Sequence, residues 1–176
     1  MTRNPILPEE LVVNPSRLWL STWLLLTAGD FERGEFNSMT VGWGTFGAMW
    51  NRPIADVVVR PVRHTYGFME EHGSFTLTAF PEEHRDALKL LGTKSGRDGD
   101  KIAEAGLTPI ASGKVAAPGF AEAELIIECR TIYWHDFDPA RFVEPAIEES
   151  YPDKDYHRSY FGEILAIQGT DAWRRP

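Results

Sequence analysis

The sequence predicts a mainly β protein with a few short helices inserted, arranged as a closed antiparallel barrel. Short apolar runs bounded by Gly, Pro and Asp recur along the chain, and several are rich in β-branched or aromatic residues. Most connections between these runs are too short for the helical crossovers of a parallel sheet. The 176 residues contain no internal repeat, low-complexity tract or long linker, so we expect a single domain over residues 1–176.

The first half of the chain supplies three expected strands and a helix. The strands cover about 19–27, 38–48 and 54–60, the last with three consecutive valines that favour extended backbone. Residues 65–71 read as a short helix closed by Gly73, because glycine is the usual residue just past a helix end.

The second half continues with three more strands, at about 75–80, 124–134 and 159–168. The strand at 124–134 shows the clearest alternation, with every second residue from Leu125 to Tyr133 on one face.

Two helices are expected between these strands. The first has Pro81 in its first turn and Gly92 after its last, and buries Ala87, Leu88 and Leu91. The second is capped by Asp98 or Asp100.

Composition excludes several classes of function. The formal net charge of −8 and a pI of about 5.1 argue against nucleic-acid binding, which requires a broad basic face. The single cysteine, Cys129, allows neither an intrachain disulfide nor a CxxC metal site. The apolar run at 18–26 is too short to span a bilayer and follows no basic leader, so we expect a cytoplasmic protein with no membrane partner.

Two short tracts at 60–65 and 95–101 combine Arg, Lys, Gly and hydroxyl side chains within this acidic chain. Each precedes a plausible helix start, where backbone N–H groups and the helix dipole favour an anion. An arginine fork can hold two oxygens of one phosphate. We therefore expect a site for a small phosphorylated ligand; the alternative is that both tracts are solvated turns with capping residues.

Four motifs in sequence carry a resemblance to a known family. They are Asn37-Ser38-Met39-Thr40-Val41-Gly42-Trp43-Gly44, Arg60-Pro61-x-Arg63-x-Thr65, Ser95-Gly96-Arg97-Asp98-x-Asp100-Lys101, and His157 followed by Gly162-Glu163-Ile164. In order and spacing, from about residue 19 to 167, the chain resembles the flavin reductase-like, flavoredoxin-type FMN-binding split-barrel family. The resemblance implies a Greek-key antiparallel split β-barrel that forms a homodimer, with FMN at or near the subunit interface.

The resemblance also implies which residues bind the cofactor. Arg60, Arg63 and Thr65 would converge on the FMN phosphate, and the ring would meet polar groups of the first motif. The full set is Asn37, Ser38, Met39, Thr40, Trp43, Gly44, Thr45, Arg60, Pro61, Arg63, Thr65, Lys94, Ser95, Gly96, Arg97 and Lys101. The alternatives are that Asn37 and Ser38 are turn residues, and that Arg97 and Asp98 form a surface ion pair.

Aromatic residues suited to stack on the flavin are Trp43, inside the first motif, and then Trp50, Phe80 and Tyr160, for which a core role is the alternative.

His157 is the catalytic candidate, with a surface or interface histidine as the alternative. Flavin-reducing relatives often place Asp directly before this histidine; here Tyr156 takes that position and Asp155 lies one residue earlier. The other histidines show no metal-ligand spacing, so no metal is expected. No GxGxxG motif is present, so NADH or NADPH would be a transient substrate.

The sequence leaves three functions open. The first is an FMN oxidoreductase that passes a hydride from NADH or NADPH to flavin and then to an acceptor. The second is a flavoredoxin-like electron carrier that exchanges electrons with a protein partner and has no nicotinamide site. The third is a non-flavin binding module on the same barrel, because a fold does not fix a function.

Overall fold

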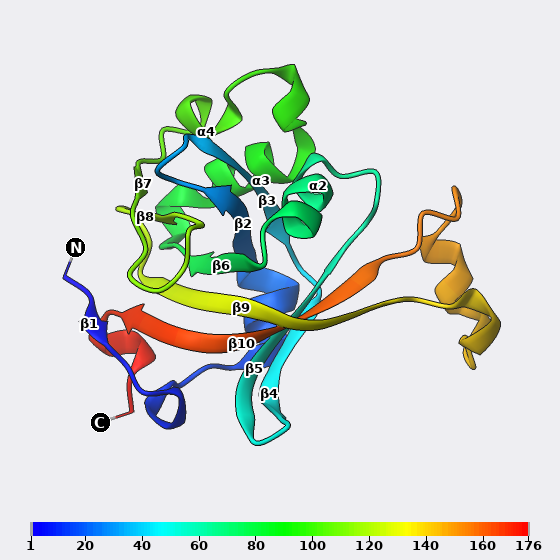
Figure 1. Ribbon diagram of the computed structural model, residues 1–176, viewed down its shortest axis with the longest axis horizontal. Coiled ribbons are helices and arrows are strands. Elements are labelled where there is room, and N and C mark those ends of the chain that lie inside the picture. Colours follow the sequence, from blue (N-terminus) through cyan, green and yellow to red (C-terminus); the bar gives the residue numbers. More distant parts are fainter. Residues whose placement is uncertain (1, 176) are drawn as a thin grey trace.

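The computed structural model describes residues 2–175 and is built mainly from antiparallel strands (Figure 1). In chain order the strands are β1 (Asn4–Pro5), β2 (Leu24–Asp30), β3 (Glu35–Val41), β4 (Gly44–Met49), β5 (Arg52–Val59), β6 (Ser74–Ala79), β7 (Pro109–Ile110), β8 (Gly119–Phe120), β9 (Leu125–Asp136) and β10 (Arg158–Gly169). The α-helices are α1 (Pro15–Arg17), α2 (His64–Glu71), α3 (Arg85–Thr93) and α4 (Lys101–Glu104). The predicted fold class, mainly β with short helices, is confirmed.

The main sheet has eight strands in the order β3-β2-β6-β9-β10-β5-β4, with β1 paired to β10. Its two edges, β3 and β4, are consecutive in sequence and are joined only by Gly42 and Trp43. A link of two residues forces the edges together, so the sheet curls into a barrel that is open between β3 and β4. Gly44 fits this corner because a Cβ there would lie 2.5 Å from the backbone oxygen of Asp56.

This corner corrects the strand predicted at 38–48, which is two strands that run along opposite edges of the sheet. The strand predicted at 19–27 is also partly wrong. Leu18–Thr22 forms a π-helical turn, and Trp23, with a positive φ of 64°, leads the chain into β2. A short apolar run without periodicity does not distinguish a buried helical turn from a buried strand.

Two hydrophobic clusters lie on either side of the sheet. The inner cluster fills the barrel with side chains such as Leu26, Val57 and Ile127, and α2 packs against β2 and β3 at its end. The outer cluster lies between the sheet and helices α3 and α4, and includes Leu88 and Leu91. In Figure 1 these helices sit together above β2, β3 and β6.

Helix boundaries differ from prediction at α3. Pro81 precedes a separate 3-10 turn, Glu82–His84, and Gly92 lies inside α3 rather than after it. Leu88 and Leu91 are buried as expected, while Ala87 is only partly buried. Of the two aspartates considered as caps, Asp100 caps α4 by accepting from the backbone N–H groups of Ile102 and Ala103.

Strand β9 is present, but both of its faces are buried near its start. Ile126 lies in the outer cluster and Glu128 accepts backbone N–H bonds from Gly113 and Lys114, so the loop before β8 covers the face expected to be polar. Tyr133, expected on the buried face, is about half exposed.

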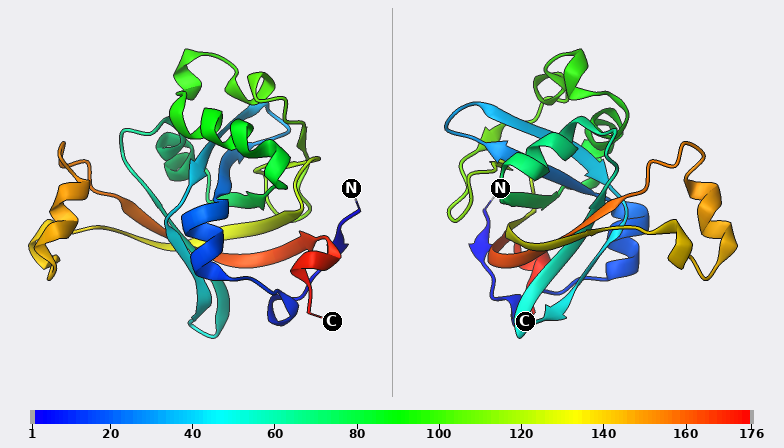
Figure 2. Two further views of the ribbon diagram at one scale, coloured as in Figure 1. Left: turned by 180° about the vertical axis from the view of Figure 1, so that it is seen from behind. Right: turned by 45° about the vertical axis from the view of Figure 1, so that its right-hand side comes forward.

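Residues 137–157, between β9 and β10, form an arm that projects from the barrel in every view (Figures 1 and 2). An aromatic strip of Trp50, Tyr133, His135 and Phe161 runs along the base of this arm, with ring centroids 5.5–6.0 Å apart.

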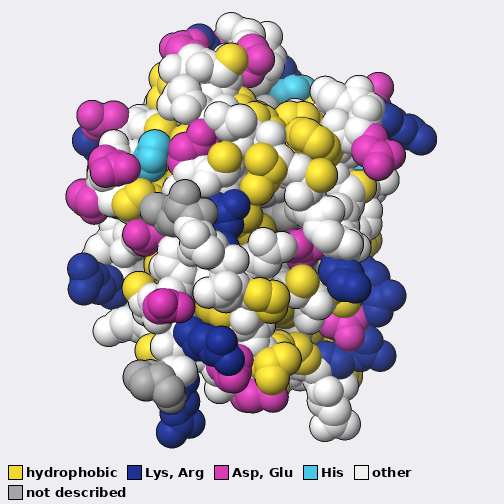
Figure 3. Space-filling view, turned by 90° about the vertical axis from the view of Figure 1, so that its left-hand side faces the viewer, with side chains coloured by type: hydrophobic (Ala, Val, Ile, Leu, Met, Phe, Trp, Pro, Cys, Tyr) yellow, Lys and Arg dark blue, Asp and Glu magenta, His cyan; other side chains and the backbone are white. Residues whose placement is uncertain are grey.

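The face at the left of Figure 1 mixes acidic and basic side chains among small apolar areas (Figure 3). Its described side chains form no broad basic surface. No helix within residues 2–175 is long and apolar enough to cross a membrane.

Candidate functional site

The corner between β3 and β4 holds a cavity of about 200 Å³, here called the corner cavity. The end of β3, the Gly42–Trp43 link and the end of β5 form its walls, and His157 reaches it from the start of β10. Its lining residues are Met39, Thr40, Val41, Gly42, Trp43, Val58, Arg60, Arg63 and His157. The Trp43 ring is 46% exposed and lies 5.1 Å from the His157 ring, so an aromatic wall stands beside open space.

His157 is buried, with 9% of its surface exposed, and its Nδ1 lies 2.8 Å from the hydroxyl of Tyr151. Burial and then the nearby positive charge of Arg60 lower the pKa of His157 to about 4. The imidazole is therefore neutral at physiological pH.

A second cavity, of about 170 Å³, adjoins the corner cavity at Arg63, which lines both. We call it the helix-end cavity, because the first residues of α2 form one wall and residues 93–96 form the other. Its lining residues are Asn37, Val62, Arg63, His64, Thr65, Thr93, Lys94, Ser95, Gly96 and Lys101. Its walls include Arg63, His64 and Thr65 at the N-terminus of this eight-residue helix, and no side chain among residues 2–175 caps that end, so its first N–H groups and its positive dipole end are available at the cavity.

The basic side chains around these cavities differ in how strongly they are already engaged. Arg63 uses one nitrogen to donate to the Gly92 carbonyl at 2.9 Å, and burial lowers its pKa. Arg60 donates to the Asp155 carboxylate and to the Ser150 carbonyl, both at 2.8 Å. Lys94 pairs with Glu104. Arg63 is thus the guanidinium placed to serve both cavities.

Lys101 is 3% exposed and holds the end of α3, because its ammonium donates to the carbonyls of Leu91 and Lys94 at 3.0 and 2.9 Å. Burial, and then Arg63, lower its pKa to about 8. This lysine is therefore first a structural tie that fixes the wall of the helix-end cavity.

Asn37 and Gly96 close the helix-end cavity from the other side. The Asn37 amide donates to the Thr65 hydroxyl at 2.7 Å, which ties β3 to α2. A Cβ at Gly96 would overlap Asn37 Oδ1, so this close approach of the 95–98 turn requires glycine.

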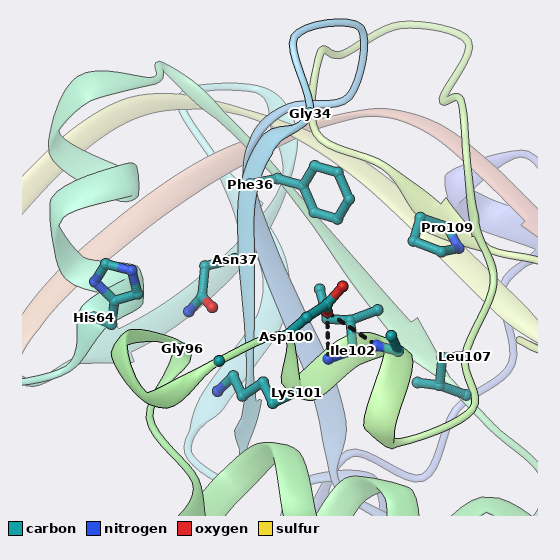
Figure 4. A pocket seen from close by; sticks show the side chains of 12 residues that line it. Gly34, Phe36, Asn37, His64, Gly96, Asp100, Lys101, Ile102, Leu107 and Pro109 are labelled. Atoms are coloured by element: carbon teal, nitrogen blue, oxygen red, sulfur yellow. Dashed lines mark hydrogen bonds between the residues drawn. The ribbon is translucent and has the colours of Figure 1, made fainter.

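Beyond Gly96 lies a third cavity, of about 340 Å³, that shares Asn37, His64, Gly96 and Lys101 with the helix-end cavity. In Figure 4 Phe36 and Pro109 stand on opposite sides of its upper part, and Asn37, His64 and Lys101 gather near Gly96.

Several predicted site residues do not reach the corner or helix-end cavity. The Ser38 hydroxyl is fully buried and bonds to the Thr27 hydroxyl at 2.7 Å, so its expected polar contact with a ligand is not available to the side chain. Thr40 lines the corner cavity, but its hydroxyl donates to the Leu88 carbonyl. Gly44, Thr45, Pro61 and Arg97 line neither cavity, and the guanidinium of Arg97 donates to Val62 O at 3.3 Å rather than pairing with Asp98.

The lower-ranked aromatics also lie elsewhere. Phe80 is in the outer cluster, and Tyr160 is buried with its hydroxyl on Glu70, so both match the core alternative. Trp50 is in the exposed aromatic strip.

The structure adds residues that the sequence did not point to. Val62 and His64 line the helix-end cavity, while Tyr151 and Asp155 contact His157 and Arg60 from the arm. Val62 and His64 occupy the two x positions of the Arg-Pro-x-Arg-x-Thr tract, so their place in that motif could have identified them. No local signal marks Tyr151, because its contact depends on how the arm folds back.

No group of three or more His, Cys, Asp or Glu side chains in the described part of the chain is arranged to hold a metal ion.

Comparison with known proteins identifies the family. The model of the flavin reductase like domain matches residues 19–169, so the chain belongs to this family. An uncharacterized protein of Pyrococcus abyssi is 27% identical over 150 residues, which cover 84% of this chain and 72% of that protein.

Solved structures share the fold. A flavoredoxin of Methanosarcina acetivorans has a TM-score of 0.67 at 22% identity, covering 97% of this chain and 75% of its own. An FMN-binding domain of a flavin reductases-like enzyme from Shewanella baltica has a TM-score of 0.68 at 18% identity, covering 96% and 77%. A flavin reductase of Shewanella frigidimarina with a split barrel domain has a TM-score of 0.67 at 18% identity, covering 85% of this chain and 67% of its own, which agrees with the barrel opening between β3 and β4.

The donor set of the two joined cavities fits FMN. The helix-end cavity offers an uncapped helix N-terminus, Arg63 and the 95–96 backbone for a phosphate. The corner cavity offers the half-exposed Trp43 ring, the 39–43 backbone and a neutral histidine for a flat ring with polar edges.

Proposed function

We propose that this member of the flavin reductase-like family binds FMN and acts as an oxidoreductase that passes reducing equivalents from NADH or NADPH through the flavin to an acceptor. One observation carries the proposal: Arg63 lines both a cationic cavity at a helix N-terminus and a cavity with an aromatic wall. A ligand with an anion at one end and a flat ring at the other matches that pair. The FMN-binding proteins of Shewanella baltica and Thermus thermophilus, which have the same fold, support the choice of FMN.

In this proposal Arg63, Thr65 and the first turn of α2 hold the phosphate, and Gly96 and Lys101 shape the opposite wall. Trp43 and the 39–43 backbone hold the ring in the corner cavity. Bound FMN supplies the hydride-transfer chemistry. His157, being neutral, offers one N–H without placing a positive charge beside the ring.

We also propose that two copies of the chain pair along β4 and the aromatic strip. Strand β4 is an edge of the sheet, and the strip exposes about half of Trp50 and of Tyr133. Such exposed aromatics are typical of interfaces. Because β4 begins directly after Trp43, a second copy there would lie beside the corner cavity. Sedimentation of the FMN-loaded protein as a monomer at micromolar concentration would contradict this pairing.

The experiment is an absorption spectrum of the purified protein with added FMN, followed by anaerobic addition of NADH or NADPH. Flavin that co-purifies or binds, and then bleaches, supports the oxidoreductase. Binding without bleaching supports the electron carrier that exchanges electrons with a protein partner, and no binding supports a non-flavin module.

Stopped-flow bleaching tests His157 as the catalytic residue. A positioned proton-transfer group typically contributes about 10²–10⁴-fold, and hydride transfer needs no obligatory acid, so His157→Ala should slow bleaching by the lower end of that range or less. FMN affinity should stay nearly unchanged. A variant with unchanged bleaching would remove His157 from the reaction.

A further inference from the structure

Tyr151 is the residue that contacts the ring of His157 through a hydrogen bond. It ends the 3-10 turn Pro145–Ser150 in the projecting arm and is 2% exposed. Its hydroxyl lies 2.8 Å from Nδ1 of His157, and the two rings stand nearly perpendicular at 78°. Tyr151 therefore contacts a residue that lines the corner cavity without lining it itself.

Arg60 fixes the arm in this position. Its guanidinium lies 5.1 Å from the centre of the Tyr151 ring and donates to both Ser150 and Asp155, on either side of that tyrosine. Phe142 stacks on Tyr151 from within the arm, with ring centroids 6.0 Å apart. The tyrosine is thus held from both sides, and its hydroxyl has little freedom to turn away from His157.

Asp155, the aspartate nearest to His157 in the sequence, does not hydrogen-bond to the imidazole. Its carboxylate accepts a hydrogen bond from Arg60 at 2.8 Å, and this contact helps to hold the arm in place. Tyr156, at the position of the missing aspartate, turns its hydroxyl to Glu148. The hydrogen bond on Nδ1 comes from Tyr151 instead.

The direction of this hydrogen bond follows from the partners present. Both groups are neutral, so a single proton lies between the hydroxyl oxygen and Nδ1, donated by one group and accepted by the other. Among residues 2–175 the Tyr151 hydroxyl has no second hydrogen-bond partner. If Nδ1 donated, the hydroxyl proton would be buried without an acceptor, which is unfavourable. The hydroxyl therefore donates, and Nε2 carries the imidazole proton.

We propose that Tyr151 is a positioning residue, whose buried hydroxyl donates to Nδ1 of His157 and so presents a protonated Nε2 to a ligand in the corner cavity. The role of this N–H in flavin reduction rests on the proposed function. The tautomer does not depend on it, because the contact exists in the protein without ligand.

The direct test is 15N NMR of the histidine rings in the flavin-free protein at neutral pH. Wild type should show His157 protonated at Nε2, with Nδ1 shifted as a hydrogen-bond acceptor. In Tyr151→Phe the Nδ1 signal should move toward the value of a free imine nitrogen. The ratio of Nδ1–H to Nε2–H should rise about 2- to 10-fold, which is the range supported by one neutral hydrogen bond.

Tyr156→Phe is the matched control, since it removes a neighbouring hydroxyl that bonds to Glu148 and not to His157. It should leave the His157 signals unchanged. A wild-type proton on Nδ1 overturns the proposal by itself, and so do unchanged His157 shifts in Tyr151→Phe.

The functional test uses FMN-loaded protein. Tyr151→Phe should slow NAD(P)H bleaching about 2- to 10-fold at unchanged FMN affinity, while Tyr156→Phe bleaches at the wild-type rate. An altered tautomer with an unaltered bleaching rate would overturn the link to catalysis. Wild-type protein that binds no FMN would instead refute the proposed function and leave the tautomer result standing.

Discussion

Replacing His157 with glutamine should remove a specific part of the acid sensitivity of this fold. Burial and the charge of Arg60 lower the folded-state pKa of His157 to about 4, against an unfolded value of 6.5. The charge of Arg63 also lowers this pKa, and the carboxylate of Asp155 raises it. Between these two values the unfolded chain binds the proton and the folded chain does not. Stability from this group is therefore complete above pH 6.5 and is lost as the pH falls toward 4.

The magnitude follows from the two pKa values. Each tenfold change in a proton dissociation constant is worth about 1.4 kcal/mol, so the full difference corresponds to about 3 kcal/mol. Between about pH 7 and about pH 4.5, the linkage relation gives a loss of roughly 2 kcal/mol in the free energy of unfolding.

The assay is urea unfolding followed by tryptophan fluorescence, for wild type and His157→Gln at both pH values. Lost packing lowers the stability of the variant equally at each pH, and the other titrating groups are common to both proteins. The wild type should therefore lose roughly 2 kcal/mol more than the variant on acidification. Equal losses, or an NMR titration of His157 near 6.5, would refute the assignment of a buried neutral imidazole.

Three further predictions concern the phosphate wall and the helices. Arg63→Ala should weaken FMN binding about 30- to several-thousand-fold, because losing a buried charge partner costs roughly 2–5 kcal/mol, and it should weaken riboflavin binding much less. Titration with both ligands checks this, with Arg97→Ala as the exposed control. Equal losses of affinity for the two ligands would show that Arg63 does not contact the phosphate. Lys101→Met should lower the free energy of unfolding by about 1–3 kcal/mol, because the carbonyls of Leu91 and Lys94 lose their buried donor; unchanged urea stability would contradict the structural tie. Gly67→Ala should raise stability by roughly 0.5–1 kcal/mol, since Gly67 lies inside α2 with nothing within 4 Å of an added Cβ; a lower melting temperature would show that α2 does not tolerate the methyl group.

Much of the fold was predictable from local patterns. The valine-rich run gave β5, the alternation from Leu125 gave β9, and the Asp100 cap gave the start of α4. The errors fall where tertiary contacts override local preference. The 38–48 strand breaks at Gly42–Trp43 because the sheet edges meet there, and no propensity signals that meeting.

The candidate site also combines features that local sequence predicts with features that depend on tertiary contacts. The Arg60–Thr65 and Ser95–Lys101 tracts were predicted to bind an anion because that chemistry depends on residue type near a helix start. Sequence could not rank the basic side chains, since it does not show that Asp155 engages Arg60 and that Glu104 engages Lys94. The sequence also could not show that the Ser38 hydroxyl is engaged, because its partner Thr27 lies opposite it on β2 and that register exists only in the folded sheet.

By itself the sequence determined an acidic, mainly antiparallel β chain with four flavin reductase-like motifs, because composition, periodicity and turn chemistry are local properties. Tertiary structure alone decided that two cavities meet at Arg63, that Lys101 serves as a tie for α3, and that Tyr151 rather than an aspartate contacts His157. These features depend on distances between residues far apart in the chain, such as Arg60 and Asp155. Burial and charge pairing, which set the pKa of His157 and the availability of each arginine, exist only once those distances are fixed.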